Sequence, residues 1–174
     1  CDRIAKEIER RQAALEAQTG PATVDATFKP YDDIVGLIGD ATGEFSLYQQ
    51  VMADDARRKS GGDCQVRLAA LASKLGLSRP IYDRLKAIDA SKADAETRDY
   101  LKLTLASYVR GGVSLPPEQR AEVQALQETL AKVGNDFDAN IAAGEKSIEV
   151  DPSELAGLPA DYIAAHKPGA DRSE

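Results

Sequence analysis

Apolar residues recur at spacings of three and four along most of the chain, which is the period of an amphipathic helix. The clearest pattern lies in residues 91–144, where two such stretches flank the sequence GGVSLPP. Glycine can end a helix in a left-handed cap and proline can occupy the first turn of the next, so this stretch predicts a helical hairpin. The second helix has a single apolar stripe, made of Val123, Leu126, Leu130, Val133, Phe137 and Ile141.

The same period predicts four further helices before residue 91. We expect them at residues 2–17, from 24–28 to Met52, at 55–75 and, in a shorter form, after an N-cap at Ser78. The third of these helices contains two adjacent glycines, which cost about 2 kcal/mol relative to alanine in a helix interior. We therefore expect it to be weakened or kinked at Gly61.

Beyond residue 141 the pattern changes. Gly144 breaks the helix, and residues 147–150 alternate polar and apolar side chains in the manner of a short extended segment. A turn-rich stretch then predicts one helical turn started by Ser153 and another over residues 160–165. The polar end of the chain, residues 167–174, contains proline and glycine and is predicted to be mobile.

These elements predict an all-α fold, an antiparallel helical bundle of about five to six helices, because short glycine and proline corners turn consecutive helices back along one another. We expect a single helical domain over residues 1–166, followed by the tail. Its core is predicted to contain Ile38, Phe45, Tyr48, Leu71, Leu101, Leu105, Leu126, Leu130 and Phe137.

Charge and hydropathy exclude two classes of partner. The chain has 22 Lys and Arg against 29 Asp and Glu, a net charge of −7, whereas a nucleic-acid partner calls for clustered cations. We interpret the basic runs at Arg10–Arg11 and Arg57–Lys59 as solvated helix faces. No apolar run approaches the length of about 20 residues that a membrane span requires. We therefore expect neither nucleic acid nor a membrane as partner.

The two cysteines, Cys1 and Cys64, are too few for a disulfide framework and lack metal-ligand spacing. Cys64 falls at helical spacing with Leu68 and Leu71, so we expect a small buried thiol, with a reactive or paired cysteine as the alternative. Cys1 begins what looks like an internal helix. We interpret it as the edge of a fragment, and lipidation at Cys1 remains the alternative.

Residues capable of chemistry are scarce. His166 is the one histidine and lies near the polar tail, so we expect it on the surface, and alone it cannot build a two-histidine zinc site. The sequence contains no H-E-x-x-H, G-x-S-x-G or phosphate-binding loop. Carboxylate pairs such as Asp32–Asp33 and Asp54–Asp55 are expected from the acidic composition. We therefore name no catalytic, cofactor-binding or metal-binding residue.

Four blocks of sequence resemble a known family: LSRPIYDRL, TRDYLKLTLASYVRGGVSLP, the helix RGGVSLPPEQRAEVQALQETLAKVGNDFDANI, and DPSELAGLPADYI. In this order and spacing they are similar to the helical N-terminal region of the thimet oligopeptidase and oligopeptidase A group of zinc metallopeptidases, from about Cys1 to Ile163. Gly134 and the Gly61–Gly62 pair depart from the helix formers expected there. In this family a catalytic core further along the chain supplies the zinc site, and a deep channel admits only short, unfolded peptides.

The resemblance implies that this chain is a non-catalytic lobe of a zinc-dependent oligopeptidase, forming part of the channel wall and a size filter. It implies the catalytic domain of the same polypeptide as partner, short peptides as substrates and zinc in the complete enzyme. A stand-alone helical module for binding or scaffolding is the alternative. We favour the cytoplasm as compartment, with the periplasm or a lipid anchor left open. In the isolated lobe we expect an apolar strip on the outer faces of the helices at 25–52 and 117–144, including Phe28, Val35, Leu37, Leu47 and Val51.

Overall fold

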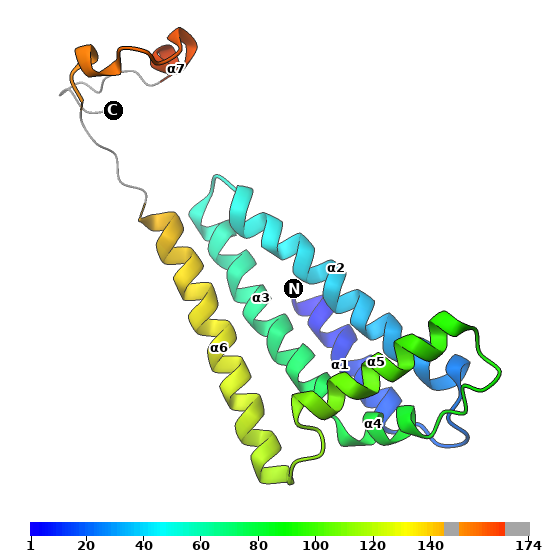
Figure 1. Ribbon diagram of the computed structural model, residues 1–174. Helices are drawn as coiled ribbons and strands as arrows, with labels where there is room; N and C mark the ends of the chain where they lie inside the picture. The colour runs from blue at the N-terminus through cyan, green and yellow to red at the C-terminus, as the bar shows by residue number, and fades with distance from the viewer. Residues whose placement is uncertain (145–149, 166–174) are drawn as a thin grey trace. The chain divides into compact units, whose positions relative to one another are not determined.

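The computed structural model describes residues 1–144 and 150–165, and the regular elements in these ranges are all helical. The all-α prediction is confirmed (Figure 1). Two compact units divide the chain, residues 1–136 and 137–174, and each is described separately below. The elements are α1 Asp2–Glu16, η1 Val24–Phe28, α2 Lys29–Val51, α3 Asp55–Gly76, α4 Arg79–Lys86, α5 Ala95–Gly111, α6 Pro117–Ala143, η2 Pro152–Leu155 and α7 Ala160–Ala165.

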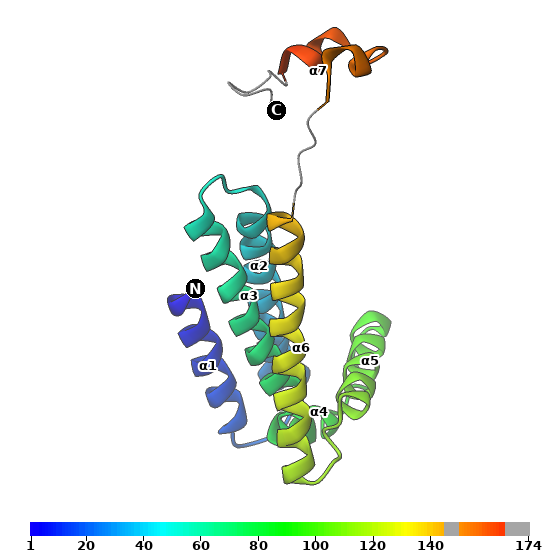
Figure 2. The same ribbon diagram turned by 90° about the vertical axis from the view of Figure 1, so that its left-hand side faces the viewer.

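In the first unit, α2 runs antiparallel to both α1 and α3, and α4 and α5 cover one end of this layer (Figures 1 and 2). The most extensive packing joins α2 to α3. The first part of α6 lies beside α3. Six long or medium helices thus match the six expected from the periodicity, and α7 is the helical turn expected at 160–165.

Side-chain caps set the helix starts in this unit. Asp54 accepts a hydrogen bond from the backbone N–H of Arg57 at 2.8 Å, and Asp94 accepts one from Thr97 at 2.6 Å. Such caps satisfy backbone donors that have no partner inside the helix. At the other end of α5, Gly112 adopts a left-handed conformation with φ of 102°, as the hairpin prediction requires.

The core of the first unit is formed by the facing sides of α1 to α5. Leu71 and Leu101 lie in it as predicted, whereas Ile38, Phe45 and Leu105 are partly buried at its edge, and Tyr48 is half-buried. The largest fully buried side chains are Ile8, Ile34, Leu68, Ile81, Leu85, Val113 and Thr27.

The glycine pair, where we expected α3 to be weakened or kinked, lies within a continuous helix and has a packing role. Both glycines are buried, and α3 continues through them to Gly76. A Cβ at Gly61 would lie 2.8 Å from the carbonyl oxygen of Phe45 on α2, and one at Gly62 would lie 2.5 Å from Oδ1 of Asn135 on α6. The pair is therefore a place where two neighbouring helices approach α3 closely, which a residue without Cβ permits.

Helix α6 contradicts the predicted core. Leu126 and Leu130 are 63% and 72% exposed, and Phe137 on the same helix is also exposed, so these three residues do not belong to the core. These residues are exposed because α6 turns a different face towards the rest of the first unit. The side chains of α6 that are half-buried within the first unit are Arg120, Val123, Gln124, Glu128, Ala131 and Asn135.

The strip expected on α2 is shorter than predicted. Leu47 and Val51 are exposed, but Val35 and Leu37 pack at the edge of the core, and Phe28 is buried. Phe28 is buried because its ring packs against the rings of Tyr31 and Tyr100, with centroids 6.3 and 5.0 Å away. Consequently only the last turns of α2 expose large apolar side chains.

Cys1 and Cys64 form a disulfide, so the expectation of a free buried thiol at Cys64 is wrong and the paired alternative holds. Cys64 is buried as predicted. The bond joins the start of α1 to the middle of α3, 63 residues apart in sequence. Beside it, Asp2 pairs with Arg67 of α3, and this partner lowers the pKa of the Asp2 carboxyl. The first turn of α1 is thus fixed to α3 by a covalent and an ionic link.

In the second unit, η2 begins with a capping box in which Asp151 accepts from the N–H of Ser153 and Glu154 accepts from the N–H of Asp151, each at 2.9 Å. Asp151, rather than the expected Ser153, is therefore the cap. Helix α7 spans the predicted residues and has no buried side chain. Three predictions concern residues outside the described ranges. They are the extended segment, of which only Val150 is described, the surface position of His166, and the tail 167–174.

Candidate functional site

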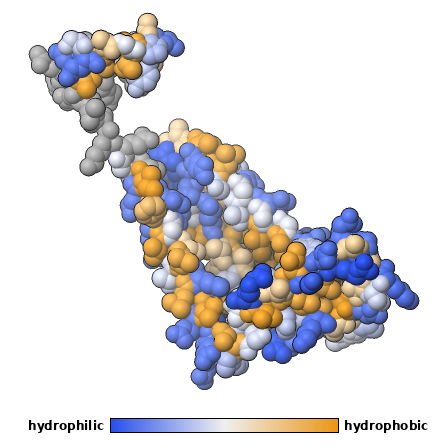
Figure 3. Space-filling model, in the orientation of Figure 1, coloured by the Kyte–Doolittle hydropathy of each residue, from blue (hydrophilic) through white to orange (hydrophobic). Residues whose placement is uncertain are grey.

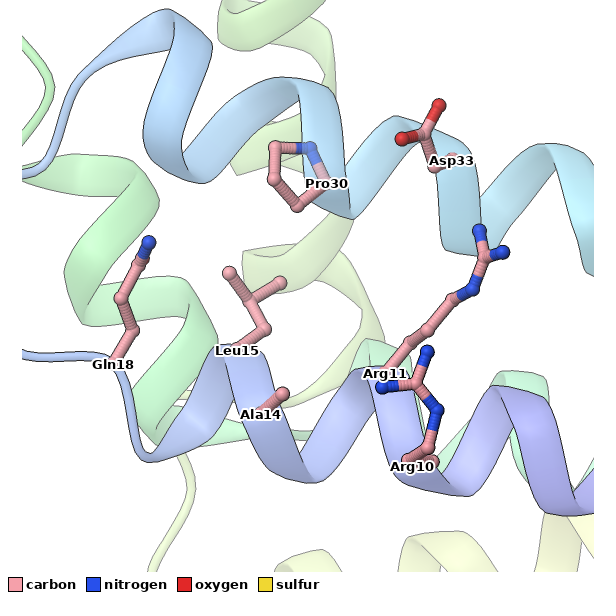
Figure 4. Close-up of a pocket in the computed structure, with 7 residues that line it drawn as sticks. All are labelled: Arg10, Arg11, Ala14, Leu15, Gln18, Pro30 and Asp33. Carbon is pink, nitrogen blue, oxygen red and sulfur yellow. The ribbon is translucent and has the colours of Figure 1, made fainter.

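A hollow of about 440 Å³ lies between α1 and the start of α2 (Figure 4). Arg11 and Leu15 point from α1 towards α2, whereas the carboxylate of Asp33 on α2 points away from α1. The hollow is open to solvent. Its lining residues are Arg10, Arg11, Ala14, Leu15, Gln18, Pro30 and Asp33.

The two arginines of this hollow already have an acidic partner. Glu7 accepts hydrogen bonds from Arg10 at 2.8 Å and from Arg11 at 2.7 Å, and these bonds lower the pKa of Glu7 to about 2. An anion entering the hollow would have to compete with this carboxylate. Apart from the exposed carboxylate of Asp33, none of the seven lining residues can act as a nucleophile, and the arginine side chains are 67% and 40% exposed. This arrangement suits a solvated helix face, as predicted for the basic pair, better than a catalytic pocket.

Three of the four carboxylates singled out in the sequence have structural partners. Asp54 caps α3, Asp55 pairs with Arg58, and Asp32 accepts a hydrogen bond from the hydroxyl of Tyr100 at 2.7 Å. Within residues 1–144 and 150–165, no group of three or more His, Cys, Asp and Glu side chains is placed to hold a metal ion. Both cysteine sulfurs are taken by the disulfide. The described donors therefore do not fit a zinc site.

A cluster of aromatic rings joins α2, α4 and α5. The ring of Tyr108 lies 5.9 Å from that of Tyr31 and 5.8 Å from that of Tyr82, and its hydroxyl donates to the carbonyl of Leu75 at 3.0 Å. Burial, followed by the charge of the neighbouring Tyr31, raises the pKa of Tyr108 far above its usual value. The phenol therefore stays neutral and ties α5 to the end of α3, which is a structural role.

The apolar face of α6, defined here as Leu126, Leu130 and Val133, is the strongest candidate for a functional surface. These three side chains are 63%, 72% and 58% exposed, and hydrophobic residues follow α6 on the side turned to the viewer in Figure 3. Isolated exposed leucines are common, but a continuous stripe on one helix marks an interaction surface. No described helix is both long and apolar enough to cross a bilayer.

Polar contacts hold α6 against its neighbours in the first unit. The amide of Gln49 on α2 donates to Oδ1 of Asn135 at 3.0 Å, and the hydroxyl of Ser73 on α3 donates to Oε1 of Gln127 at 2.5 Å. Amphipathic helices normally bury their apolar stripe in the domain core. Here the helix rests on α2 and α3 by amide side chains and turns its apolar face away from them.

The sequence identified this stripe but assigned it to the core, because periodicity shows that a helix has an apolar face and not what covers it. One signal in the sequence could have raised the alternative. Gln124, Gln127 and Asn135 form a run of amides on a neighbouring face of the same helix, and amides are suited to contacts between helices.

Two curated proteins similar to this chain are oligopeptidases from Arabidopsis thaliana. Organellar oligopeptidase A of chloroplasts and mitochondria is 26% identical over 163 residues, which cover 90% of this chain and 20% of that protein. A probable cytosolic oligopeptidase A is 25% identical over 163 residues, which cover 90% of this chain and 22% of that protein. The chain is related to oligopeptidase A. It spans about a fifth of the length of these relatives, and no family model matches it.

Proposed function

We propose that this chain is the non-catalytic N-terminal helical region of a longer oligopeptidase that hydrolyses short peptides. The observation that carries the proposal is the similarity to two oligopeptidase A proteins over 90% of the chain but only about a fifth of their length. The α1–α5 core and the capped helices give a preformed, rigid body. A rigid body of this kind suits a wall rather than a reaction centre.

In the complete enzyme, this region would form part of the wall of the substrate channel and act as a size filter. A wall excludes folded proteins only if it resists deformation, and the disulfide between α1 and α3 together with the tight contact at Gly61 supports such stiffness. Zinc, bound elsewhere in the polypeptide, would supply an activated water for peptide hydrolysis. The partner of this region is then the catalytic domain of the same polypeptide.

The alternative is a stand-alone helical module for binding or scaffolding. Its support is that the first unit has a well-formed core of its own, with eighteen buried apolar residues in one cluster. Under that alternative, the apolar face of α6 would be a site for a separate protein, and the chain would have no hydrolytic activity in any longer form.

Expression of the complete reading frame tests the proposal. We expect an H-E-x-x-H motif after the present residues and zinc-dependent hydrolysis of short fluorogenic peptides, with no hydrolysis of a folded protein of the same composition. The 174-residue chain alone should be inactive. A zinc-loaded complete protein that cleaves no peptide would contradict the proposal and favour the stand-alone module.

A further inference from the structure

We propose that the apolar face of α6 is the docking site for an amphipathic helix with basic flanks, supplied by the remainder of the same polypeptide. This inference rests on the proposed function for the source of the helix. Its physical basis is independent and consists of the exposure of the face, the spacing of its residues, a glycine beside it and the charges along its edge.

The spacing on α6 is that of a helix-to-helix seam. Leu126, Leu130 and Val133 follow one another at intervals of four and three, and the half-buried Val123 precedes them by three, so that these residues take the a and d positions of a heptad. A partner helix can insert its own apolar side chains between such positions. A flat sheet or an extended peptide offers no matching period, so the seam selects a helix.

Gly134 adds a second observation. It lies in the interior of α6, one residue after Val133 and one turn after Leu130, where glycine costs about 1 kcal/mol relative to alanine. A Cβ at Gly134 would meet nothing within 4 Å, so the described contacts do not require glycine at this position. At Gly61, a glycine of the same kind admits the backbone of α2. A helix packed closely on the apolar face of α6 would give Gly134 the same role.

The charges along the seam indicate what the partner carries. Glu122 and Asp136 lie fourteen residues apart on one edge of the face, at the heptad position before a, where they flank a docked helix. On the other edge lie Gln127 and Gly134, which bear no charge. A partner with Lys or Arg beside its own apolar residues would therefore gain complementary pairs, mainly in specificity and orientation.

The same charges disfavour an antiparallel second copy of this chain and add nothing to a parallel one. In an antiparallel pair of α6 helices, the acidic edge of one would face the acidic edge of the other, and like charges repel. In a parallel pair, Glu122 and Asp136 would face uncharged residues. The relatives, by contrast, contain about four fifths of their length outside the matched stretch, which is ample for a helix that covers this face.

The test uses a single introduced cysteine, because the chain has no free thiol in its described residues. Leu130→Cys is labelled with a maleimide in the 174-residue chain and in the complete protein. Lys132→Cys, exposed on another face of the same helix, is the matched control. We expect Leu130→Cys to react at least about tenfold more slowly in the complete protein, because labelling then requires local opening, while Lys132→Cys keeps its rate.

Two further variants test the details. Glu122→Lys combined with Asp136→Lys should speed the labelling of Leu130→Cys in the complete protein about two- to fivefold at low salt, the range of exposed ion pairs. Gly134→Leu should speed it as well if the partner helix approaches at this point. Both variants leave the α1–α5 core untouched, and circular dichroism of each checks that α6 stays folded.

Four outcomes would overturn the inference, each in a recognisable way. Equal labelling of Leu130→Cys in both proteins would leave the face uncovered, and slowing only on addition of a peptide would place it in the substrate channel. Slowing that depends on the concentration of the 174-residue chain would identify a second copy. A reading frame without further residues would remove the proposed source. Peptide hydrolysis is measured separately, so a protected face in a protein without peptidase activity would refute the proposed function and leave the docking site standing.

Discussion

Helices α3 and α6 lie side by side in the first unit, but they differ in how the strength of the apolar pattern relates to burial. α3 begins with the polar run DARRKSGGD and has a weak apolar pattern, yet Cys64, Leu68, Leu71 and Leu75 are all buried. The stripe of α6 is longer and more regular, yet the apolar face of α6 is exposed. Burial therefore depends less on the strength of a helical pattern than on which neighbours reach the helix.

The contact between the two helices explains this difference. Gly62 leaves a space on α3 that Asn135 of α6 fills, and Gln49 of α2 donates a hydrogen bond to the same amide. Because this side of α6 faces α3, its helical geometry turns Leu130 roughly 140° away from Asn135 around the axis. The rotation of α6 about its axis, and hence the exposure of its apolar residues, follows from one glycine and two amides.

The largest expected effect is that of the disulfide, which ties α1 to α3 but does not involve α6. Closing a loop of 63 residues reduces the entropy of the unfolded chain, which stabilises the fold by about 4 kcal/mol in the loop-closure description. Replacement of both cysteines by serine should therefore lower the free energy of unfolding by about this amount. Urea melts of the variant and of the oxidised chain check the value.

Thiol titration provides the control for this prediction. The oxidised chain should show no reactive thiol before reduction and two afterwards in denaturant. Two reactive thiols in the protein as isolated would contradict the pairing. Disulfides persist mainly in oxidising compartments, so a confirmed bond would also count against the cytoplasm that the sequence favoured.

The second effect measures the buried side of α3. Leu68→Ala removes a fully buried side chain and should cost about 3 kcal/mol, within the range of 2–5 for such truncations. Leu103→Ala on α5 is the matched control, because Leu103 is 63% exposed and the same change should cost less than about 0.5 kcal/mol. Equal losses in the two variants would show that the buried face of α3 has been misassigned.

The third effect compares the two glycines of α3. Gly61→Ala places a Cβ against the backbone of α2, so the helices must move apart, at a net cost of about 1–2 kcal/mol after the gain in helix propensity. Gly62→Ala meets only the end of the Asn135 side chain, which can move, and should cost less. A thermal melt in which Gly62→Ala is the more damaging variant would contradict this account of the packing.

The fourth effect concerns the link between α5 and the end of α3. Tyr108→Phe removes the hydrogen bond to the carbonyl of Leu75 and should cost about 1 kcal/mol. Burial raises the pKa of Tyr108 in the folded state, so its contribution is fully present below the unfolded pKa of about 10 and is lost as pH rises above it. The difference between the unfolding free energies at pH 8 and pH 11 should therefore be smaller in the variant than in the parent. Unchanged pH dependence would contradict a buried, neutral phenol.

Much of the fold was predictable because helix ends are coded locally. Ser78 and Gly112 cap helices where the sequence places them, and α7 spans the expected residues 160–165. The disulfide was not predictable, because a pairing across 63 residues depends on how α1 packs on α3. The role of Gly61 was missed for the same reason, since a glycine that kinks a helix and one that admits a neighbour look alike in sequence.

The apolar residues of the candidate site were predictable from the sequence, but their exposure was not. The stripe containing Leu126 and Leu130 was found from its spacing, yet the burial of that stripe was assumed from the same spacing. An exposed strip was also expected, but its first part is buried or partly buried, because Phe28 joins an aromatic cluster and Val35 packs at the edge of the core. Local patterns thus located the apolar faces and could not say which face the chain itself covers.

The smallest expected effect is on α6. Leu130→Ala shortens a side chain that is 72% exposed, so it removes little buried area and should change the unfolding free energy of the 174-residue chain by less than about 0.5 kcal/mol. A core position would cost 2–5 kcal/mol, as expected for Leu68. In the complete protein, a docked helix would cover Leu130, and the same substitution should then cost more. The difference between the two proteins, measured in parallel urea melts, separates an exposed helix from a covered one. A loss above 2 kcal/mol in the short chain would instead return Leu130 to the core and remove the contrast between α3 and α6.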